Sequence, residues 1–391
     1  AYLGSSSDPH DLSCDYNGQM NTANCYVVTH PGYYKFPLVY GNAIKNGATN
    51  SIAYGINDGS NISFTFVNHL DQLIADPYIY ENSGCTVGSA ELVWQDAQNL
   101  ISNNIALCDG NTYISFEITK ENIEQGNAVI AVKHTDGTIM WSWHIWVTNK
   151  NVYETQAVTA SYNSTTKTLM LLPFPLGWND STPAPTCTFY QWGRKDPFPP
   201  SDGSSLTSTT DKTVYKYDTN GNSTTSNCWS KVSSQADIAT SILNPSTFYY
   251  GRFNWCSQSS KELWNVGEDD YDVDFELITK SVYDPSPAGF RLPETAAFTG
   301  FTQNGTINGN WNDTTKGYTF TTNGVDTYWQ ACGYRDNNSG SFSSVGSYGY
   351  YWPAGPSDTS FGRSLFFYSS GVAPQNSGER ASGFSVRPVS E

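Results

Sequence analysis

The densest group of potential metal ligands in this sequence is an acidic run at residues 267–274. It reads GEDDYDVD and holds five carboxylates in eight residues. Calcium prefers clustered oxygen ligands, so Asp269, Asp270 and Asp272 are the candidate ligands of a calcium ion. The spacing lacks the glycine and the terminal glutamate of an EF-hand loop. A solvated acidic loop is therefore the alternative, and it is the one that we favour.

Motifs for covalent or hydrolytic catalysis are absent from the sequence. It has no GxSxG, no HExxH and no glycine-rich phosphate loop with a lysine. The paired carboxylates of a glycosidase are defined by their distance in space, so the sequence leaves them open. Eight cysteines are scattered without a CxxC pair, which excludes the usual zinc spacing. The shortest disulfide loops would join Cys14 to Cys25 and Cys85 to Cys108, and reduced, buried thiols are the alternative.

The last sixty residues have the composition of a recognition surface. Tyr, Ser, Gly, Asn and Phe dominate residues 334–391, which contain no His, Cys or Lys. Tyr and Trp supply stiff contact area, while Ser, Gly and Asn supply adaptable hydrogen bonds. The alternative is that the aromatic side chains pack a core and the polar ones form turns, and we expect this packing role for Tyr351, Trp352, Leu365 and Phe367. The candidate ligand-binding residues are Asp336, Asn337, Phe342, Tyr348, Tyr350, Asp358, Phe361, Ser364, Phe366, Tyr368, Ala373, Gln375, Ser377 and Ser382.

Length, composition and charge narrow the fold class and the partners. At 391 residues two domains are the default expectation. Short apolar runs between Gly, Ser, Thr and Asn predict a mostly β protein with some α+β character. The net charge of −16 would repel nucleic acid, whose binders need a basic face. No apolar run approaches the roughly 20 residues that span a bilayer, and the start at AYLGSSSD indicates a processed or truncated terminus.

The first half has the pattern of a β-sandwich. Residues 1–22 are polar and expected to be flexible, and about seven short alternating runs follow in residues 23–150. Asp136-Gly137 separates two of these runs, which is a strong hairpin signal. We expect His144, in the second run, to be a hydrogen-bonded strand residue rather than a metal ligand. In that run the residues expected to face the core are Ile139, Trp141, Trp143, Ile145 and Val147.

The second half is irregular. Residues 148–156 form the candidate linker, and long loops rich in Ser, Thr, Asn and Gly follow, especially at 201–227. Two short helices are expected, one at residues 234–242 and one after Glu294. A domain with so few regular elements must be organised by buried aromatic side chains. The candidates are Trp192, Trp229, Trp255, Trp264, Trp311, Trp329 and Trp352.

Distinctive phrases recur along the second half. They are QWGRKDPFP (191–199), VYDPSPAGFRLPETAAFTGF (282–301), CGYRDNNSG (332–340), GSYGYYW (346–352) and GFSVRPV (383–389). In this order they resemble the major paralogous domain family of bacterial surface proteins, whose members look like C-type-lectin-fold modules. In the first half, PGYYKFPLVYGNAIKNG and AVIAVKHTDGTIMWSWHIWVT resemble the β-sandwich that precedes this module in fimbrillin-like proteins. The resemblance implies an N-terminal Ig-like sandwich at residues 23–150 and a C-type-lectin-like α+β domain at residues 151–391.

Residues 334–389 also resemble the variable region of proteins diversified by retroelements, with the variable surface at about 334–382. There, fixed framework residues alternate with positions descended from Asn codons. Leu365 and Phe367 would be buried framework, while Ser364, Phe366 and Tyr368 would point to the opposite face. Exposing two neighbouring aromatic side chains on one strand face harms solubility unless that face binds something.

These resemblances imply a secreted adhesin at the cell surface or fimbrial tip of a bacterium. Its partner would be a protein or glycan receptor on another cell or phage, and other fimbrial subunits are a second class of partner. The alternative is a structural pilus subunit without a ligand of its own, and a carbohydrate-active enzyme is a third reading. The lectin-like fold is similar to that of formylglycine-generating enzymes, which use a late cysteine pair. Only Cys332 lies in that stretch here, so we expect no enzyme, and no cofactor beyond the candidate calcium.

Overall fold

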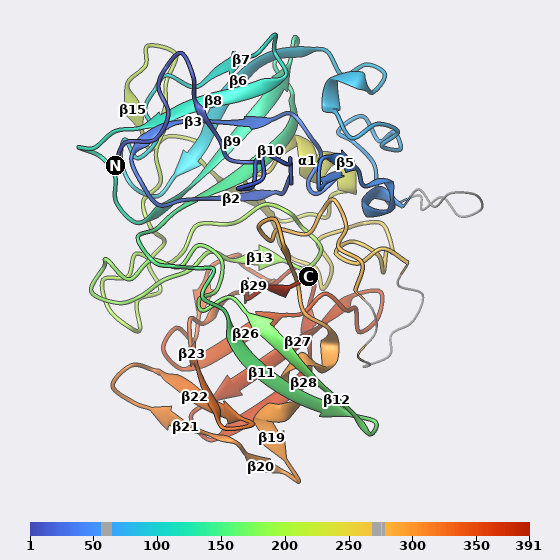
Figure 1. The fold of residues 1–391 in the computed structure, drawn as a ribbon. Helices are drawn as coiled ribbons and strands as arrows, with labels where there is room; N and C mark the ends of the chain where they lie inside the picture. Colours follow the sequence, from blue (N-terminus) through green and yellow to red (C-terminus); the bar gives the residue numbers. More distant parts are fainter. Residues whose placement is uncertain (56–64, 268–274, 276–277) are drawn as a thin grey trace.

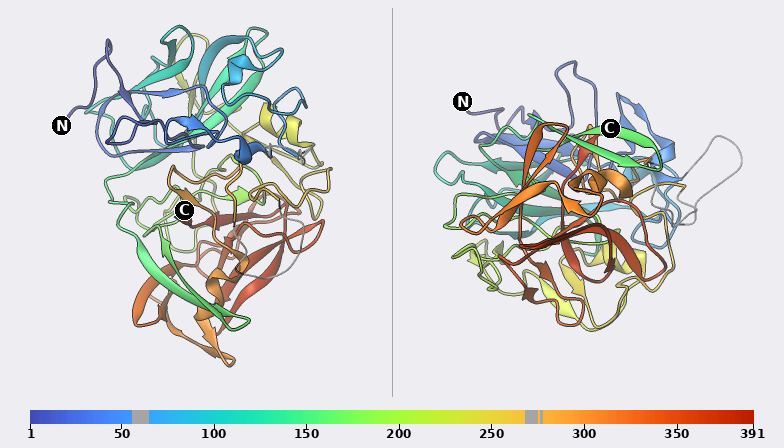
Figure 2. Two further views of the ribbon diagram at one scale, coloured as in Figure 1. Left: turned by 45° about the vertical axis from the view of Figure 1, so that its right-hand side comes forward. Right: turned by 90° about the horizontal axis from the view of Figure 1, so that it is seen from below.

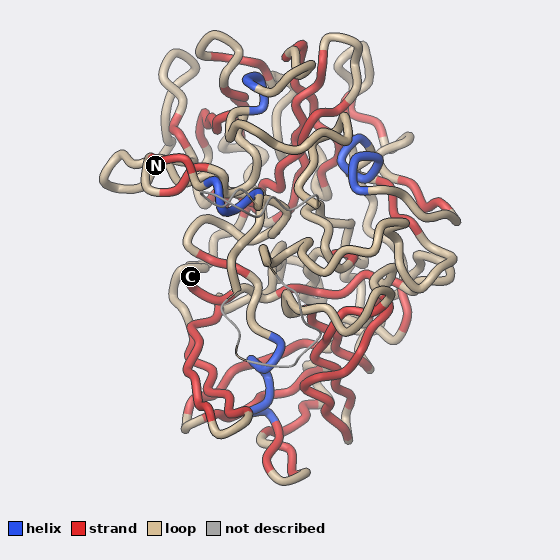
Figure 3. Tube along the Cα trace, turned by 90° about the vertical axis from the view of Figure 1, so that its right-hand side faces the viewer, coloured by secondary structure: helices blue, strands red, loops and turns tan. Residues whose placement is uncertain are grey.

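The computed structural model describes residues 1–55, 65–267, 275 and 278–391, and it is mostly β. Strands and loops dominate the trace in Figure 3, and helices are few. Within the described ranges, no helix is long and apolar enough to cross a membrane. Both expected helices are present, the second as a 3-10 helix. The helices are α1 (Ile238–Leu243), η1 (Ser51–Tyr54), η2 (Ile79–Glu81) and η3 (Thr295–Phe301).

Two four-stranded sheets form the N-terminal half, at the top of Figure 1. One has the order β1 (His10–Asp11), β3 (Gly32–Pro37), β8 (Tyr113–Ile118) and β7 (Ala106–Cys108). The other has the order β2 (Cys25–Val28), β10 (Ile139–Val147), β9 (Gly126–His134) and β6 (Val87–Gln95). The sheets meet through Phe36 of β3, whose ring centre lies 5.2 Å from that of Tyr26 on β2 and 5.0 Å from that of Trp143 on β10. The expected sandwich-like arrangement is confirmed.

Residues 1–22, expected to be flexible, are hydrogen-bonded to this sandwich. β1 pairs in parallel with β3, so that His10 lies opposite Tyr34. Leu3 forms a further bridge with Gly32. The backbone groups at the edge of β3 need partners, and this polar segment supplies them. Its few apolar residues gave no alternating pattern from which the pairing could be predicted.

The hairpin predicted at Asp136-Gly137 joins β9 to β10, which pair antiparallel. Gly137 has a φ of 92°, a left-handed conformation that favours glycine. The Asp136 carboxylate accepts hydrogen bonds from the Thr138 backbone N–H (2.9 Å) and hydroxyl (2.7 Å). These bonds lower the pKa of Asp136 to about 2. The local turn chemistry therefore fixes where the chain reverses between β9 and β10.

The β2-β10-β9-β6 sheet is buried on both faces. Alternation identified the face of Trp143, but the opposite face is covered by the second half of the chain. There Val129 of β9 packs in one cluster with Val214 and Cys228. A bulge after Ile139 places that residue in this cluster, rather than with Trp143 as expected.

His144 is a hydrogen-bonded strand residue, as expected. Its Nε2 lies 2.8 Å from Asn127 Oδ1, and its Nδ1 lies 3.3 Å from the Tyr190 hydroxyl. Complete burial lowers the pKa of His144 to about 3, because the imidazolium would lose its hydration.

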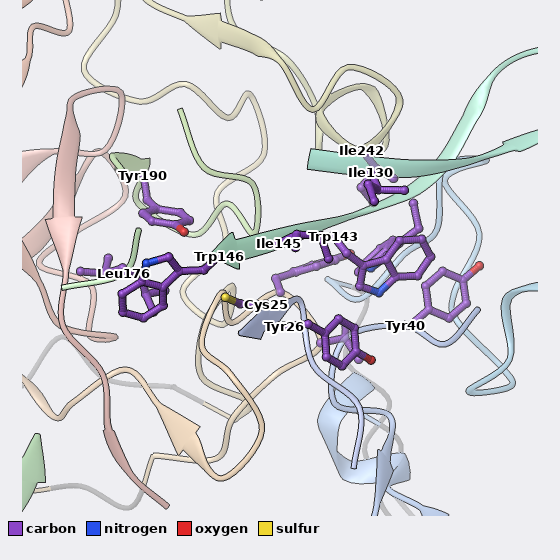
Figure 4. Close-up of a cluster of buried hydrophobic side chains, with 14 of the residues drawn as sticks. Cys25, Tyr26, Tyr40, Ile130, Trp143, Ile145, Trp146, Leu176, Tyr190 and Ile242 are labelled. Atoms are coloured by element: carbon purple, nitrogen blue, oxygen red, sulfur yellow. The ribbon is translucent and has the colours of Figure 1, made fainter. Parts of the chain in front are cut away.

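Residues 148–156 do not separate two cores. Val152 is buried, and a single cluster of buried side chains extends through both halves. Figure 4 places Trp146 and Cys25 of the first half close to Leu176 and Tyr190 of the second. The Trp146 indole N–H donates to the carbonyl of residue 178 (3.1 Å). The two halves are therefore packed into one continuous body, as the views in Figure 2 also show.

Three larger sheets organise the second half, at the bottom of Figure 1. The first runs β25 (Phe342–Ser343), β24 (Tyr334–Arg335), β29 (Gly383–Val386), β26 (Tyr348–Trp352), β27 (Phe361–Tyr368) and β28 (Gly371–Glu379), with β13 (Tyr190–Gln191) also paired to β29. The second runs β11 (Gln156–Tyr162), β12 (Thr165–Leu171), β30 (Val389–Ser390) and β18 (Phe290–Arg291). The third runs β21 (Gly309–Asn312), β22 (Gly317–Thr322) and β23 (Val325–Gln330).

Short two-stranded pairs complete the fold. They are β4 (Ile44–Lys45) with β5 (Ala48–Thr49), β14 (Lys216–Tyr217) with β15 (Ser223–Thr224), β16 (Ser230–Val232) with β17 (Thr247–Tyr249), and β19 (Thr302–Gln303) with β20 (Thr306–Ile307). Of the expected tryptophans, Trp229 and Trp311 are only half-buried, and the other five are buried.

Buried arginines hold the loops of the second half together. Arg387 lies 4.4 Å from the centre of the Trp329 ring. It donates to the carbonyls of residues 172 (2.8 Å), 173 (2.9 Å) and 328 (2.8 Å), and to Gln156 Oε1 (2.8 Å). Arg380 lies 4.0 Å from the Trp192 ring and donates to the carbonyls of residues 260 (2.5 Å) and 358 (2.6 Å). In each case one guanidinium satisfies carbonyls from segments far apart in the chain.

Two further arginines act in the same way. Arg194 donates to the carbonyls of residues 241 (3.3 Å) and 244 (3.2 Å), at the end of α1. Arg335 lies 4.1 Å from the Phe342 ring and donates to the carbonyls of residues 199 (2.6 Å) and 340 (3.0 Å). The expectation that aromatic side chains alone organise this half therefore missed the cations that stack on them.

We predict that Arg387→Met lowers the free energy of unfolding by about 3 kcal/mol, because it leaves several buried carbonyls without a donor. Urea unfolding followed by tryptophan fluorescence measures this. Arg252→Met is the control, since Arg252 is exposed and should change stability by less than about 0.5 kcal/mol. Equal effects of the two substitutions would contradict the role given to Arg387.

We predict that His144 makes the fold sensitive to acid. Its pKa is about 3 when folded and close to the ordinary 6.5 when unfolded, so the unfolded state binds the proton first. Its contribution to stability is complete above pH 6.5 and is lost as the pH falls towards 3, at up to about 1.4 kcal/mol per pH unit. In urea titrations at pH 4–7, His144→Gln should therefore lose less stability on acidification than the wild type. Parallel pH profiles would contradict this.

Candidate functional site: an aromatic face on the C-terminal sheet

Four aromatic candidates meet on one face of the β26–β27 pair. These strands are antiparallel, and their register sets Tyr348 opposite Tyr368 and Tyr350 opposite Phe366. Because side chains alternate along a strand, all four rings project from the same side of the sheet. We call Tyr348, Tyr350, Phe366 and Tyr368 the aromatic face.

The other side of the same strands forms a core. Tyr351, Leu365 and Phe367 are buried, as expected of framework residues. The Tyr351 ring lies edge-on to Trp329 of β23 at 4.8 Å, and Phe367 lies edge-on to Phe320 of β22 at 5.8 Å. The three-stranded sheet thus supports the aromatic face from behind.

A continuous stack of rings joins the aromatic face to the interior. It begins at buried Trp352, whose centre lies 4.0 Å from that of Phe384. Phe384 lies 4.4 Å from Tyr350, Tyr350 lies 4.6 Å from Phe366, and Phe366 lies 5.6 Å from Tyr368. Interplanar angles along the stack are 25°, 24°, 23° and 28°. Each inner ring is therefore held between two others.

Exposure rises along this stack. Tyr350 and Phe366 are half-buried, whereas Tyr368 is 38% exposed and its neighbour Tyr348 is 37% exposed. Tyr348 stands edge-on to Phe366 at 5.3 Å. The Tyr368 ring lies over Gly371, where an added Cβ would come within 2.4 Å of it. The outer rings are thus exposed but held in place.

Ser364 was a candidate ligand-binding residue, and the structure does not display it at the surface. It is fully buried, and the side-chain amide of Asn376, opposite it on β28, donates to its hydroxyl (3.4 Å). Along β27 the less buried positions are Phe361, Arg363 and Phe366, and only Tyr368 is exposed.

Three other candidates are also buried rather than displayed. Phe342 packs edge-on against Phe189 at 5.0 Å, beneath the Arg335 guanidinium. Asn337 lies in a turn and donates to the carbonyl of residue 252 (3.2 Å), in a distant segment. Ser382 is 1% exposed. These residues therefore pack the interior or form turns, which was the alternative to ligand binding.

The remaining candidates fall into two groups. Ala373 lies opposite Phe366 in the register, at the border of the aromatic face, and Gln375 lies where the register between β27 and β28 shifts. Asp336 begins the neighbouring turn, where its carboxylate accepts the N–H of residue 338 (2.5 Å). The others, Asp358, Phe361 and Ser377, lie at the far end of β27, with Phe361 roughly 16 Å along the strand from Phe366.

Sequence reasoning missed three aromatic residues. Tyr334 lies edge-on to Tyr350 at 5.1 Å and extends the aromatic face. Phe384, in the phrase GFSVRPV, is the second ring of the stack. Phe253, which is 60% exposed, stacks on Phe361 at 5.6 Å, but it lies in a distant loop with no alternating pattern.

The aromatic face is suited to contact rather than to chemistry. Burial, with smaller effects from Tyr334, Glu379 and Tyr348, raises the pKa of Tyr350, so its hydroxyl stays protonated. In the described part of the chain, no group of three or more His, Cys, Asp or Glu residues could hold a metal. The calcium candidates Asp269, Asp270 and Asp272 lie outside the described residues.

A groove between β6 and the β14–β15 hairpin is lined partly by titratable groups, including Glu91, Lys216 and Asp218. Glu91 is paired with Lys133 at 2.9 Å. Lys216 donates to the carbonyl of residue 227 (2.9 Å), and Asp218 accepts the N–H of residue 220 (2.9 Å). Each of these three side chains therefore has a partner within the protein.

We predict that the rings of the aromatic face differ sharply in their effect on stability. Tyr350→Ala should lower the free energy of unfolding by about 2 kcal/mol, because the ring is stacked on both sides. Tyr368→Ala should lower it by less than about 1 kcal/mol, because that ring ends the stack and is exposed. Urea unfolding measures both. Equal losses would mean that Tyr368 belongs to the core.

Comparison of this chain with protein-family models, with curated proteins and with solved structures finds no match. What the aromatic face does must therefore be inferred from its own geometry. That geometry consists of exposed tyrosines at the end of a ring stack, on a sheet supported from behind by a second core.

Proposed function

We propose that this protein is an adhesin that grips a protein ligand through the aromatic face. The observation that carries the proposal is the ring stack from Trp352 to Tyr368, which ends in exposed tyrosines. Ordered aromatic anchors surrounded by polar residues are typical of binding hot spots. Because the rings are already held in place, binding would require little further ordering of side chains.

A protein ligand suits this face better than a glycan. Sugars stack on the open faces of aromatic rings, but both faces of Tyr350 are occupied, by Phe366 and Phe384. Phe366 likewise lies between Tyr350 and Tyr368. Ring edges and tyrosine hydroxyls remain available, and these suit a broad surface of mixed polarity.

The wider setting of the proposal is a bacterial cell surface or fimbrial tip, with residues 23–150 as the stalk. The β26–β27 pair has one exposed and one buried side, which is compatible with diversification by a retroelement. Tyr348 and Tyr368 are exposed, whereas Leu365 and Phe367 are buried behind them. Exchange of the first pair would leave the core intact.

A structural pilus subunit is the second candidate, and one observation favours it. The two-residue strand β1 covers one edge of β3 and is the outer strand of its sheet. Release of so short a strand would open that edge to a strand from another subunit. Laddered oligomers of the full chain would favour this candidate over the adhesin.

The adhesin proposal is tested with Tyr348→Ser/Tyr368→Ser in the full chain. Printed arrays of epithelial surface and matrix proteins, and of glycans, are the probes. We expect wild type to bind protein spots and the double variant to bind them at least tenfold more weakly, since it loses two anchors. Tyr16→Ser/Tyr153→Ser is the matched control, because both rings are exposed and lie outside this sheet.

Two outcomes would contradict the proposal. Undiminished protein binding by the Tyr348→Ser/Tyr368→Ser variant would exclude the aromatic face as the binding site. Binding to glycan spots alone would mean that the ligand class is wrong.

A further inference from the structure

Two buried cysteines from distant parts of the chain touch each other. The Sγ atoms of Cys187 and Cys332 lie 3.6 Å apart, and the residues are 145 positions apart in the sequence. Cys187 precedes β13, and Cys332 follows β23. All eight cysteines lie in the described part of the chain and are free thiols there, including those of the expected pairs Cys14 with Cys25 and Cys85 with Cys108.

The surroundings leave room for a bond. A disulfide needs its sulfurs about 2.05 Å apart, so the two side chains would together have to close roughly 1.5 Å. A small cavity borders both cysteines and is also lined by Leu206 and Val345. Cys187 Sγ lies 3.2 Å from the Ser385 hydroxyl, and no charged side chain lines this cavity. Side-chain rotation into the cavity can therefore accommodate the change.

We propose that Cys187 and Cys332 form a disulfide bond in the mature protein. The two thiols lose two electrons and two protons, and an S–S bond forms between them. The acceptor is the disulfide of a thiol oxidase or of oxidised glutathione, whose own S–S bond breaks to give two thiols. Because both cysteines are buried in the folded chain, the exchange occurs during folding, while they are still accessible.

The bond would reinforce the scaffold of the aromatic face. Cys187 touches Ser385 of β29, and Gly333, next to Cys332, forms a bridge with Gly349 of β26. Both strands belong to the sheet that carries the rings. A cross-link that closes so long a loop removes many conformations from the unfolded chain. The inference does not depend on the adhesin proposal, since it concerns only the fold.

The test maps the cross-link in the full chain, produced in an oxidising compartment. The protein is unfolded in denaturant with iodoacetamide and no reductant, then digested and analysed by mass spectrometry. We expect one linked peptide pair, containing Cys187 and Cys332, and alkylation of the other six cysteines. We also expect dithiothreitol to lower the melting temperature by about 5 °C or more, because the loop constraint is lost.

Two variants isolate the effect of the pair. Cys187→Ala/Cys332→Ala should show no change in melting temperature with dithiothreitol. Cys25→Ala/Cys256→Ala removes two other buried thiols and should keep the full reductant effect. Alkylation of Cys187 and Cys332 in the wild type, or linkage of either to another cysteine, would overturn the proposal. Peptide mapping of the wild type decides this even if a variant fails to fold.

Discussion

The second half of this protein depends on buried guanidinium groups that stack on aromatic rings and donate to backbone carbonyls. A loop-rich domain has many carbonyls without a partner in a helix or sheet, and burying them unpaired is costly. Arg387 satisfies three carbonyls from two separate segments while its flat face covers Trp329. Arg380 does the same over Trp192. A planar cation with five donors suits this task, because a lysine has three donors and no flat face to lay against a ring.

These buried contacts support a sheet that carries exposed aromatic rings on one side. The β26–β27 pair has a packed side, with Leu365 and Phe367, and an aromatic face that ends in exposed Tyr368. The ring stack passes through Phe384 to Trp352, so the outer rings are coupled to the interior by direct contact. In such a surface the outermost rings contribute little to the fold, whereas the inner rings of the stack and the core beneath them are held on several sides.

The two halves share a core, and this matters for the proposal that the first half is a stalk and the second half binds the ligand. The second half covers the outer face of the β2-β10-β9-β6 sheet, and Asn24 of the first half donates to the carbonyls of residues 282 (2.6 Å) and 284 (2.9 Å). Lys195 donates to the Ser142 hydroxyl (2.6 Å) from across the same boundary. Such an interface transmits force between the halves as a packed unit, unlike a flexible linker.

Local chemistry in the sequence determined the mostly β class, the Asp136-Gly137 hairpin, and the burial of Leu365 and Phe367. Turn geometry and strand alternation act over a few residues, so they can be recognised without knowing what packs nearby. Only the tertiary structure decided that Ser364 is buried, because burial depends on what packs over the strand face. The stacking of Arg387 on Trp329 and the contact of Cys187 with Cys332 were likewise undetermined, since each joins residues far apart in the chain.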